Sequence, residues 1–227
     1  MLHHPSSLLR QFQTTLDVYL LNKENHIRTD ADVERITGYE CSTSVLQIHG
    51  NRVIIVREPM ERTSPADGLL TDQKQLLLMI RAADCQPILA YNPDRNIIGL
   101  LHVGWKGLVA KTIPAFFQKL NTEYGVHPAD TFIYIGPSIR QCCAQYRETD
   151  HPLREFDETF WNGNFVDLAG IADKQFHDAG VLSERIERHR DCTCCHPKNY
   201  WTYRGGDKEK VQEGWTNVLA AALKTHN

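Results

Sequence analysis

Residues 83–107 read ADCQPILAYNPDRNIIGLLHVGWKG and contain two apolar runs joined by a polar turn. The runs Pro87–Tyr91 and Ile97–Val103 are nearly continuous, which is typical of strands that are covered on both faces. Between them, residues 92–96 are Asn, Pro, Asp, Arg and Asn, a composition that favours a turn. We therefore expect two buried neighbouring strands, with the apolar run Leu76–Ile80 as a third neighbour in the same sheet.

Working outward from this centre, further strands and helices follow from composition and spacing. Two more β-rich runs predict strands, and three longer segments predict helices, the last of which would close the chain. The fold class that we expect is α/β (mixed α+β), a layered sandwich with central mixed sheets covered by helices, in a single domain over residues 1–227. The expected strands are Val53–Val56 and Thr131–Ile135, and the expected helices are Leu108–Leu120, residues 151–180 with interruptions, and residues 211–224.

Composition excludes several classes of protein. The apolar fraction of 41%, the charged fraction of 23% and the net charge of −3 give no basic surface for nucleic acid. The chain has neither an N-terminal apolar run of signal-peptide length nor a run of the roughly twenty apolar residues needed to cross a bilayer, so we expect a cytoplasmic protein without a membrane partner. Seven cysteines, an odd number, are better explained as reduced thiols or metal ligands than as disulfides.

Three possible metal ligands stand at the ends of strand-like runs: His49, Cys85 and His102. One thiolate and two neutral imidazoles suit zinc, with a fourth position left open for water or substrate. Two other interpretations use the same residues. Cys85 can act as a metal-free nucleophile activated by His102, with Asp84 or Asp67 orienting the imidazole. Alternatively, Cys85 is a small buried side chain, and both histidines are satisfied by backbone carbonyl groups.

Other segments offer weaker signals. Gly104 and Gly107 would let backbone N–H groups approach an anion, while Tyr203 can stack on a base and Arg204 can pair with phosphate. A second cysteine group contains Cys142-Cys143 and the cluster Cys192–Cys195, which resembles a zinc knuckle. Because adjacent cysteines rarely bind one metal comfortably, we expect reduced, partly buried thiols there, with a second metal as the alternative.

Taken in order, the motifs resemble those of the polyphenol oxidase or laccase-domain family, now regarded as zinc-dependent purine nucleoside phosphorylases with adenosine deaminase activity. The resemblance runs from about residue 45 to the C-terminus, and residues 1–44 are divergent. It rests on Gln47-x-His49-Gly50, Ala66-Asp67-Gly68, Ala83-Asp84-Cys85-x-Pro87, His102-x-Gly104-Trp105-x-Gly107, Ile135-Gly136-Pro137 with Cys142-Cys143, and Cys192-Thr193 with Tyr203-Arg204.

The resemblance implies one zinc per chain, bound by His49, Cys85 and His102, in a pocket for adenosine, inosine or methylthioadenosine and for phosphate. It also implies a fold similar to that of bacterial toxin cysteine hydrolases. A histidine-rich set of copper centres cannot be built from one Cys and two His, so copper is not expected. Cys85 and His102 would also be catalytic, and Asp84 would either support the ligand residues from outside or handle protons. The phosphate-binding candidates are Arg81, Lys106 and Arg204.

Several points stay open at the level of sequence. The family usually has Arg where this chain has Lys106, and a lysine cannot make the same two-pronged contact with phosphate. Two alternative functions remain: a metal-free cysteine hydrolase or amidase that uses Cys85 and His102, and a catalytically degenerate nucleoside-binding protein. The preferred nucleoside and the oligomeric state do not follow from the residues.

Overall fold

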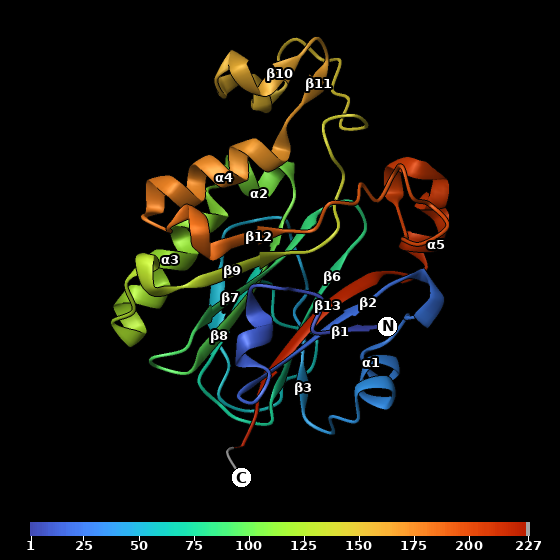
Figure 1. Cartoon of the computed structure of the whole chain (residues 1–227). Helices are drawn as coiled ribbons and strands as arrows, with labels where there is room; N and C mark the ends of the chain where they lie inside the picture. The colour runs from blue at the N-terminus through green and yellow to red at the C-terminus, as the bar shows by residue number, and fades with distance from the viewer. Residues whose placement is uncertain (226–227) are drawn as a thin grey trace.

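The computed structural model describes residues 1–225, and in this part of the chain two mixed β-sheets lie face to face with helices on both outer sides (Figure 1). The predicted mixed α/β class with central sheets and covering helices is thereby confirmed. Residues 1–44 belong to this architecture, because they supply β1, β2 and β3 and the helix α1, Asp30–Thr37.

The larger sheet has six strands and contains the two runs from which the sequence analysis started. β7 and β8 pair antiparallel along their whole length, from Gln86 opposite Val103 to Asn92 opposite Ile97, as predicted. β5 and β9 flank this pair antiparallel, and the edge strands β4 and β12 are parallel to their neighbours. In spatial order the strands are β12 (Ile186–Arg188), β9 (Phe132–Ile135), β7 (Gln86–Asn92), β8 (Ile97–Val103), β5 (Gly68–Thr71) and β4 (Val53–Ile55).

The smaller sheet has five strands, and it corrects two predictions. The apolar run near Leu76–Ile80 does form a strand, but that strand belongs to this second sheet and is not a neighbour of β7 and β8. The helix predicted over residues 211–224 is wrong, since half of that segment, residues 217–223, forms the central strand of this sheet. In spatial order the strands are β1 (Leu2–His3), β2 (Leu16–Leu21), β13 (Asn217–Leu223), β6 (Leu77–Ala82) and β3 (Ser42–Thr43).

The last strand, β13, reads Asn-Val-Leu-Ala-Ala-Ala-Leu, which is a good helix sequence by propensity alone. It becomes a strand because it pairs antiparallel with β2 on one side and β6 on the other, so both of its edges are satisfied. Val218, Ala220 and Ala222 face one side, and Leu219, Ala221 and Leu223 face the other. Small residues fit this position because a layer covers each face, and long-range pairing outweighs local propensity.

Three hydrophobic cores lie between the four layers of sheets and helices. Between the sheets, Val18, Ile80 and Leu219 of one sheet pack with Leu89 and Leu100 of the other. On the outer face of the larger sheet, Phe116 and Phe176 belong to the core that the helices α3 and α4 form against the sheet. On the outer face of the smaller sheet, α1 contributes Val33. The order is therefore helix, five-stranded sheet, six-stranded sheet, helices (Figure 1).

Helix boundaries differ from those expected. The helix predicted over Leu108–Leu120 is split at Lys111, whose φ is +60°, into α2 (Trp105–Val109) and α3 (Thr112–Tyr124). Pro114 is the third residue of α3, in the first turn, where a missing N–H costs nothing. Within residues 151–180 only α4 (Leu168–Ala179) is an α-helix. The preceding residues form short 3₁₀ turns and the hairpin β10 (Trp161–Asn162) and β11 (Phe165–Val166).

Residues 200–214, which lead into β13, contain no strand. Tyr200 and Trp201 are buried, as a packed strand would be, but they are not in a strand. A π-helical turn over Tyr203–Asp207 follows, and it leads into the short helix α5 (Lys208–Gln212). None of the helices in residues 1–225 has the length and apolar character that a bilayer crossing requires.

The packing of α3 on β8 predicts the effect of one added methyl group. A Cβ on Gly99 of β8 would overlap the Phe116 ring and approach the side chain of Leu70 to 2.8 Å. We expect Gly99→Ala to lower the free energy of unfolding by about 1–3 kcal/mol, the usual cost of overpacking a core. In a Phe116→Leu background the same substitution should cost less, because the ring is gone. Urea denaturation of the four proteins of this cycle measures both values; equal costs in the two backgrounds would contradict the contact.

Candidate functional site

The register of three neighbouring strands brings the predicted site residues together. Gly68 of β5 lies opposite Leu101, so Asp67 comes opposite His102, whose N–H donates to the Asp67 carbonyl at 2.8 Å. On the other side of β8, Gln86 lies opposite Val103, so Cys85 comes opposite Gly104. Because side chains alternate along a strand, His102 points to the same side as Ile98 and Leu100, toward the second sheet. The site thus lies at one end of the space between the sheets.

The carboxylate of Asp67 connects this sheet end to the loop that carries His49. It is fully buried and accepts a hydrogen bond from His102 Nδ1 at 2.9 Å and from the N–H of His49 at 2.9 Å. Its second oxygen accepts from the N–H groups of Ile48 and Gly50. Burial alone would raise the pKa of Asp67, but the bonds from His102 and the backbone outweigh burial and lower it. Asp67 is therefore an anion that orients His102 and holds the His49 loop.

Cys85 and His102 form an ion pair in the metal-free protein. Burial opposes a thiolate at Cys85, but the adjacent charge of His102, together with hydrogen bonds from His102 and His49, lowers the pKa of Cys85 to about 6. Burial likewise opposes an imidazolium at His102, yet Cys85 and Asp67 together raise its pKa to about 9. Between these values the thiolate and the imidazolium stabilise each other.

His49 completes a group of three possible ligands with Cys85 and His102. The ligand atoms of the three residues all lie within 4.8 Å of one another, and the rings of His49 and His102 are 4.7 Å apart in an edge-on arrangement. Because Nδ1 of His102 is bonded to Asp67, its Nε2 is the nitrogen left to face the group. These three residues are the ones that the sequence predicted as a metal site.

Backbone geometry around the group is unusual in two places and constrained in a third. His49 has φ of +60° and Asp84 has φ of +86°, a conformation that is uncommon for residues other than glycine. At Gly104 a Cβ would lie 2.5 Å from Cys85 Sγ and 3.6 Å from the His49 ring, so only glycine leaves room for the sulfur. The glycine of the His102-x-Gly104-Trp105 motif is thus explained by the approach of the thiol.

The group lies in a cavity of about 610 Å³, which is large enough for a nucleoside. Several aromatic side chains and four cationic ones line it, and the only carboxylate among its lining residues is that of Asp84. The cavity therefore suits a planar ring with an anionic or strongly polar neighbour. Its aromatic and cationic lining residues are Trp105, Tyr146, Tyr203, Trp215, Arg62, Arg81, Lys106 and Arg204.

The three predicted anion ligands differ in how far their cationic groups are already engaged: Arg81 is held in an ion pair, Arg204 donates one hydrogen bond to a carbonyl group, and Lys106 has neither contact. Arg81 is 7% exposed, forms an ion pair with Asp30 and donates to the carbonyl of Arg28, so its guanidinium is already occupied. Lys106 is exposed, and among residues 1–225 its ammonium contacts only the Trp105 ring, 5.6 Å away, with no ion pair. Arg204 is also exposed and lies 5.3 Å above the Tyr146 ring.

Asp84 lies in the wall of the cavity but has a different set of contacts from that expected of a proton-handling group. Its carboxylate accepts hydrogen bonds from the hydroxyl groups of Thr193 and Thr202, both at 2.7 Å, and from the N–H of Arg204 at 2.6 Å. Both of its oxygens thus have hydrogen-bond donors within the protein. The contacts therefore favour a role in positioning Arg204, whose guanidinium in turn donates to the Gln145 carbonyl at 2.7 Å.

Sequence reasoning missed Arg62, Tyr146 and Trp215 in the cavity wall. Arg62 stands in a loop, Tyr146 follows the cysteine pair, and Trp215 precedes the strand that was expected to be a helix. Nothing in their local sequence indicates that they meet, since three separate loops bring them together. Asp67 was considered only as an alternative to Asp84 for orienting His102, and the geometry selects Asp67.

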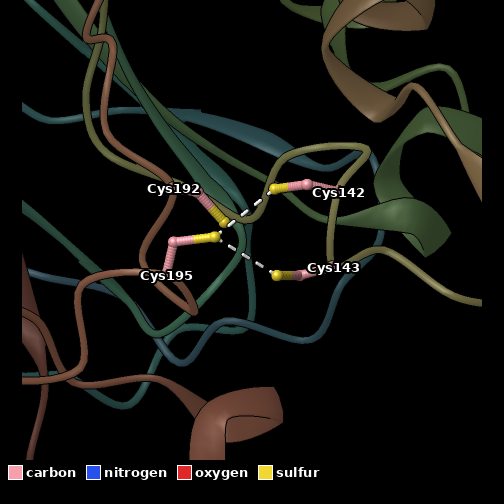
Figure 2. A group of neighbouring side chains, drawn as sticks. All are labelled: Cys142, Cys143, Cys192 and Cys195. Carbon is pink, nitrogen blue, oxygen red and sulfur yellow. Dashed lines mark hydrogen bonds between the residues drawn. The ribbon is translucent and has the colours of Figure 1, made fainter.

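All seven cysteines are free thiols in the structure, as expected. Four of them, Cys142, Cys143, Cys192 and Cys195, form a second group whose sulfur atoms all lie within 4.8 Å of one another (Figure 2).

Comparisons with known proteins agree with the fold and with the motifs. A family model described as multi-copper polyphenol oxidoreductase laccase matches residues 22–218. A Rickettsia conorii protein named purine nucleoside phosphorylase RC0672 is 30% identical, over 89% of this chain and 89% of that protein. Purine nucleoside phosphorylase LACC1 of Mus musculus is 27% identical, over 67% of this chain but only 38% of its own length. Bacillus subtilis YlmD, with the same enzyme name, is 28% identical over 70% of this chain and 63% of that protein.

Solved structures show the same fold at lower identity. The Bacillus licheniformis hypothetical protein YfiH superposes with a TM-score of 0.81 at 20% identity, covering 95% of this chain and 94% of its own. YlmD from Geobacillus stearothermophilus superposes with a TM-score of 0.78 at 22% identity, covering 92% of both chains.

The ion pair predicts how Cys85 reacts in chelator-treated protein. The thiolate is the species that iodoacetamide alkylates, so the rate at Cys85 should rise with pH around a midpoint near 6 and level off above it. In His102→Gln the midpoint should move up toward the ordinary cysteine value of about 8.5. Peptide mass spectrometry measures the rate at each cysteine, with the exposed Cys41 as internal reference. Equal midpoints in the two proteins would contradict the pairing.

Proposed function

Because the chain belongs to the multi-copper polyphenol oxidoreductase laccase family, several of whose members are named purine nucleoside phosphorylases, we propose that it is a zinc-dependent phosphorylase of purine nucleosides that also deaminates adenosine. The substrates would be adenosine, inosine or methylthioadenosine, together with phosphate. The observation that carries the proposal is the position of His49, Cys85 and His102 at the end of a cavity with aromatic and cationic walls.

The donor set suits one zinc ion. A thiolate and two imidazoles are ligands that zinc prefers, and three protein ligands leave a coordination position open, as in catalytic zinc sites. Asp67 supports the fit, because a carboxylate on Nδ1 of His102 fixes the ring and directs Nε2 toward the group. The same donor types also suit copper, but multi-copper oxidation needs several histidine-rich centres, and the four-cysteine group contains no histidine. Bound zinc would supply a Lewis acid at this end of the cavity.

The walls of the cavity would hold the two substrates of phosphorolysis. In this reaction a phosphate oxygen bonds to C1′ of the ribose while the bond from C1′ to the base nitrogen breaks. Lys106 and Arg204 line the wall without an ion pair to a carboxylate and can neutralise the phosphate, with Arg62 as a third cation, whereas Arg81 is held by Asp30. Trp105 and Tyr146, whose ring centres are 6.4 Å apart, offer faces against which a purine can stack.

A second candidate function has an observation of its own in its favour. The contacts from Cys85 to His102 and from His102 to Asp67 form a Cys-His-Asp arrangement, and the lowered pKa of Cys85 is what a thiol nucleophile needs. A metal-free cysteine hydrolase or amidase would use the same residues without zinc. The two functions differ in what stabilises the thiolate, so metal content separates them.

Substitution of the shared ligand tests the proposal. We expect Cys85→Ala to lose about one zinc per chain and to lower turnover of adenosine by at least about 100-fold, more than loss of an outer contact to a metal site would cost. Elemental mass spectrometry measures the metal, and chromatography measures adenine and inosine with and without phosphate. Cys41→Ala, at an exposed cysteine away from the cavity, is the matched control and should keep both metal and activity.

The products distinguish the outcomes of this assay. Adenine release that requires phosphate supports phosphorolysis, and inosine formed without phosphate supports deamination. Full turnover of adenosine by Cys85→Ala would contradict both phosphorolysis and deamination at this site. Alkylation of one Cys85 per chain at a rate that a chelator leaves unchanged, in protein without zinc, would favour the cysteine hydrolase. Tight nucleoside binding without turnover would identify a degenerate binding protein.

The free ammonium of Lys106 predicts a separate effect on phosphate. Lys106→Gln should raise the KM for phosphate by about 10-fold, because a charge-assisted bond is worth roughly 1.5 kcal/mol or more, while the KM for nucleoside changes little. Lys106→Arg keeps the charge and should retain phosphate affinity. Lys111→Gln is the matched control, since Lys111 lies over Phe156 and does not line the cavity. Initial rates with phosphate varied at saturating nucleoside measure the change; an unchanged KM in Lys106→Gln would remove this residue from the phosphate site.

A further inference from the structure

Four cysteines from two distant segments meet outside the cavity. Cys142 and Cys143 follow β9, and Cys192 and Cys195 follow β12, some fifty residues later. The two strands are parallel neighbours, with Ile135 opposite Arg188, so the chain leaves both at the same edge of the sheet. Beyond the strands the two segments stay joined, because the N–H of Thr193 donates to the Ser138 carbonyl at 3.1 Å and Ser138 and Cys192 form a further parallel bridge.

The four thiols point toward one another (Figure 2). Cys195 Sγ lies 3.5 Å from Cys142 Sγ and 3.5 Å from Cys143 Sγ, and all four sulfur atoms are within 4.8 Å of each other. In a tetrahedral zinc site with Zn–S bonds of about 2.3 Å, neighbouring sulfur atoms are about 3.8 Å apart. The two distances of 3.5 Å are close to such an edge, and the bound of 4.8 Å on the other four leaves them within about 1 Å of it. Thiols that only fill space need not converge in fours.

The local sequence and backbone support the same interpretation. Cys192 and Cys195 have the spacing Cys-x-x-Cys of zinc knuckles, and the N–H of Arg140 donates to Cys192 Sγ at 3.4 Å. Cys194, between them, is not part of the group and instead packs against the main hydrophobic core. Cys142 and Cys195 are exposed, so their convergence gains little from burial of apolar surface. Cys192 belongs to that core as well, so what distinguishes Cys194 is that its sulfur lies outside the group of four.

We propose that Cys142, Cys143, Cys192 and Cys195 bind a second zinc ion as four thiolates, in a closed structural site that is separate from the His49, Cys85 and His102 group. On binding, four S–H groups release their protons to solvent and four Zn–S bonds form, which leaves a site with a net charge of −2. No position stays open for substrate, so this zinc has no part in bond breaking. It is an addition to the proposed function and does not depend on it.

The segments that this zinc joins also build the wall of the cavity. On the first segment, Ile139 and Tyr146 line the cavity and the Gln145 carbonyl accepts from Arg204. On the second, the Thr193 hydroxyl donates to Asp84, beside Cys85. Metal binding at the four cysteines therefore crosslinks the two parts of the wall that hold Arg204 and Asp84. Removal of the metal should loosen the wall without touching the catalytic group.

Zinc content of the full-length protein tests the proposal. The protein is purified under reducing conditions and its zinc and iron are measured by elemental mass spectrometry. We expect two zinc ions per chain in the wild type, one in Cys195→Ser and one in Cys142→Ser, with two retained in the matched control Cys194→Ser. Cys142 and Cys195 are both exposed, so a serine at either position leaves the core unchanged, and two variants guard against the failure of one to fold.

The Cys85→Ala protein isolates the second site. It should keep one zinc, and X-ray absorption at the zinc edge should give sulfur neighbours only, at about 2.3 Å. A chelator should lower the melting temperature of Cys85→Ala and leave that of the double variant Cys85→Ala/Cys195→Ser unchanged. As a single substitution, Cys195→Ser should raise the KM for nucleoside more than it lowers kcat, because loss of this metal changes the cavity wall and not the group of His49, Cys85 and His102.

The outcomes separate the two metal sites. If the wild type and Cys85→Ala each hold one zinc and Cys195→Ser holds none, the four-thiolate site stands and the catalytic zinc fails. The second site is wrong if zinc in Cys195→Ser and Cys142→Ser equals that of the wild type. It is equally wrong if iron replaces zinc, or if the intact mass shows a disulfide among these four residues in protein that holds no metal there.

Discussion

The candidate site depends on the buried carboxylate of Asp67. An unpaired charge in this position would cost several kcal/mol, so the anion is retained only because four donors surround it: His102 Nδ1 and three successive backbone N–H groups from Ile48 to Gly50. Those donors come from the end of β8 and from a loop before β4, and Asp67 itself precedes β5. One side chain thus fixes the imidazole of His102 and the loop of His49 relative to each other. The left-handed backbone of His49 is part of this arrangement, since it lets consecutive N–H groups converge on one acceptor.

The second constraint is the crossing between the two sheets. β6 ends at Ala82 in the smaller sheet and β7 begins at Gln86 in the larger one, so residues 83–85 carry the chain across. A crossing this short forces Asp84 into a left-handed conformation and delivers Cys85 to the edge of the gap between the sheets, beside Gly104. The thiol therefore lies where the apolar layer between the sheets gives way to the cavity. Burial there opposes both charges, but the charged partners outweigh it, which lowers the pKa of the Cys85 thiol to about 6 and raises that of His102 to about 9.

Local sequence was sufficient for the strands β4, β7, β8 and β9 and for the three residues His49, Cys85 and His102, because apolar runs and motif spacing are local signals. Local sequence was insufficient where residues far away in the chain determine the secondary structure or the contacts of a segment. The alanine-rich β13 has helical propensity and becomes a strand only between β2 and β6, and the run around Leu78 cannot indicate which of two sheets it joins. Arg81 was a candidate anion ligand because its local sequence gives no sign of the ion pair that it forms with Asp30, about fifty residues away. The sequence left open whether Asp84 supports the site or handles protons, because its donors come from residues 193–204, far away in the chain.

The two cysteine-containing groups differ in the number of donor atoms they offer and in the space they leave beside those atoms. His49, Cys85 and His102 offer three donors on one side of a cavity, which leaves room for a reacting molecule. The four cysteines offer a complete tetrahedron and no such room. Adjacent cysteines such as Cys142 and Cys143 look unsuitable for one metal in a regular strand or helix, where neighbouring side chains diverge. In the irregular segment after β9 that argument fails, because no pleat or helical turn separates their sulfur atoms. The parallel pairing of β9 with β12 then brings a Cys-x-x-Cys segment against them, so the topology of the sheet, rather than the spacing of the cysteines, decides that four thiols meet.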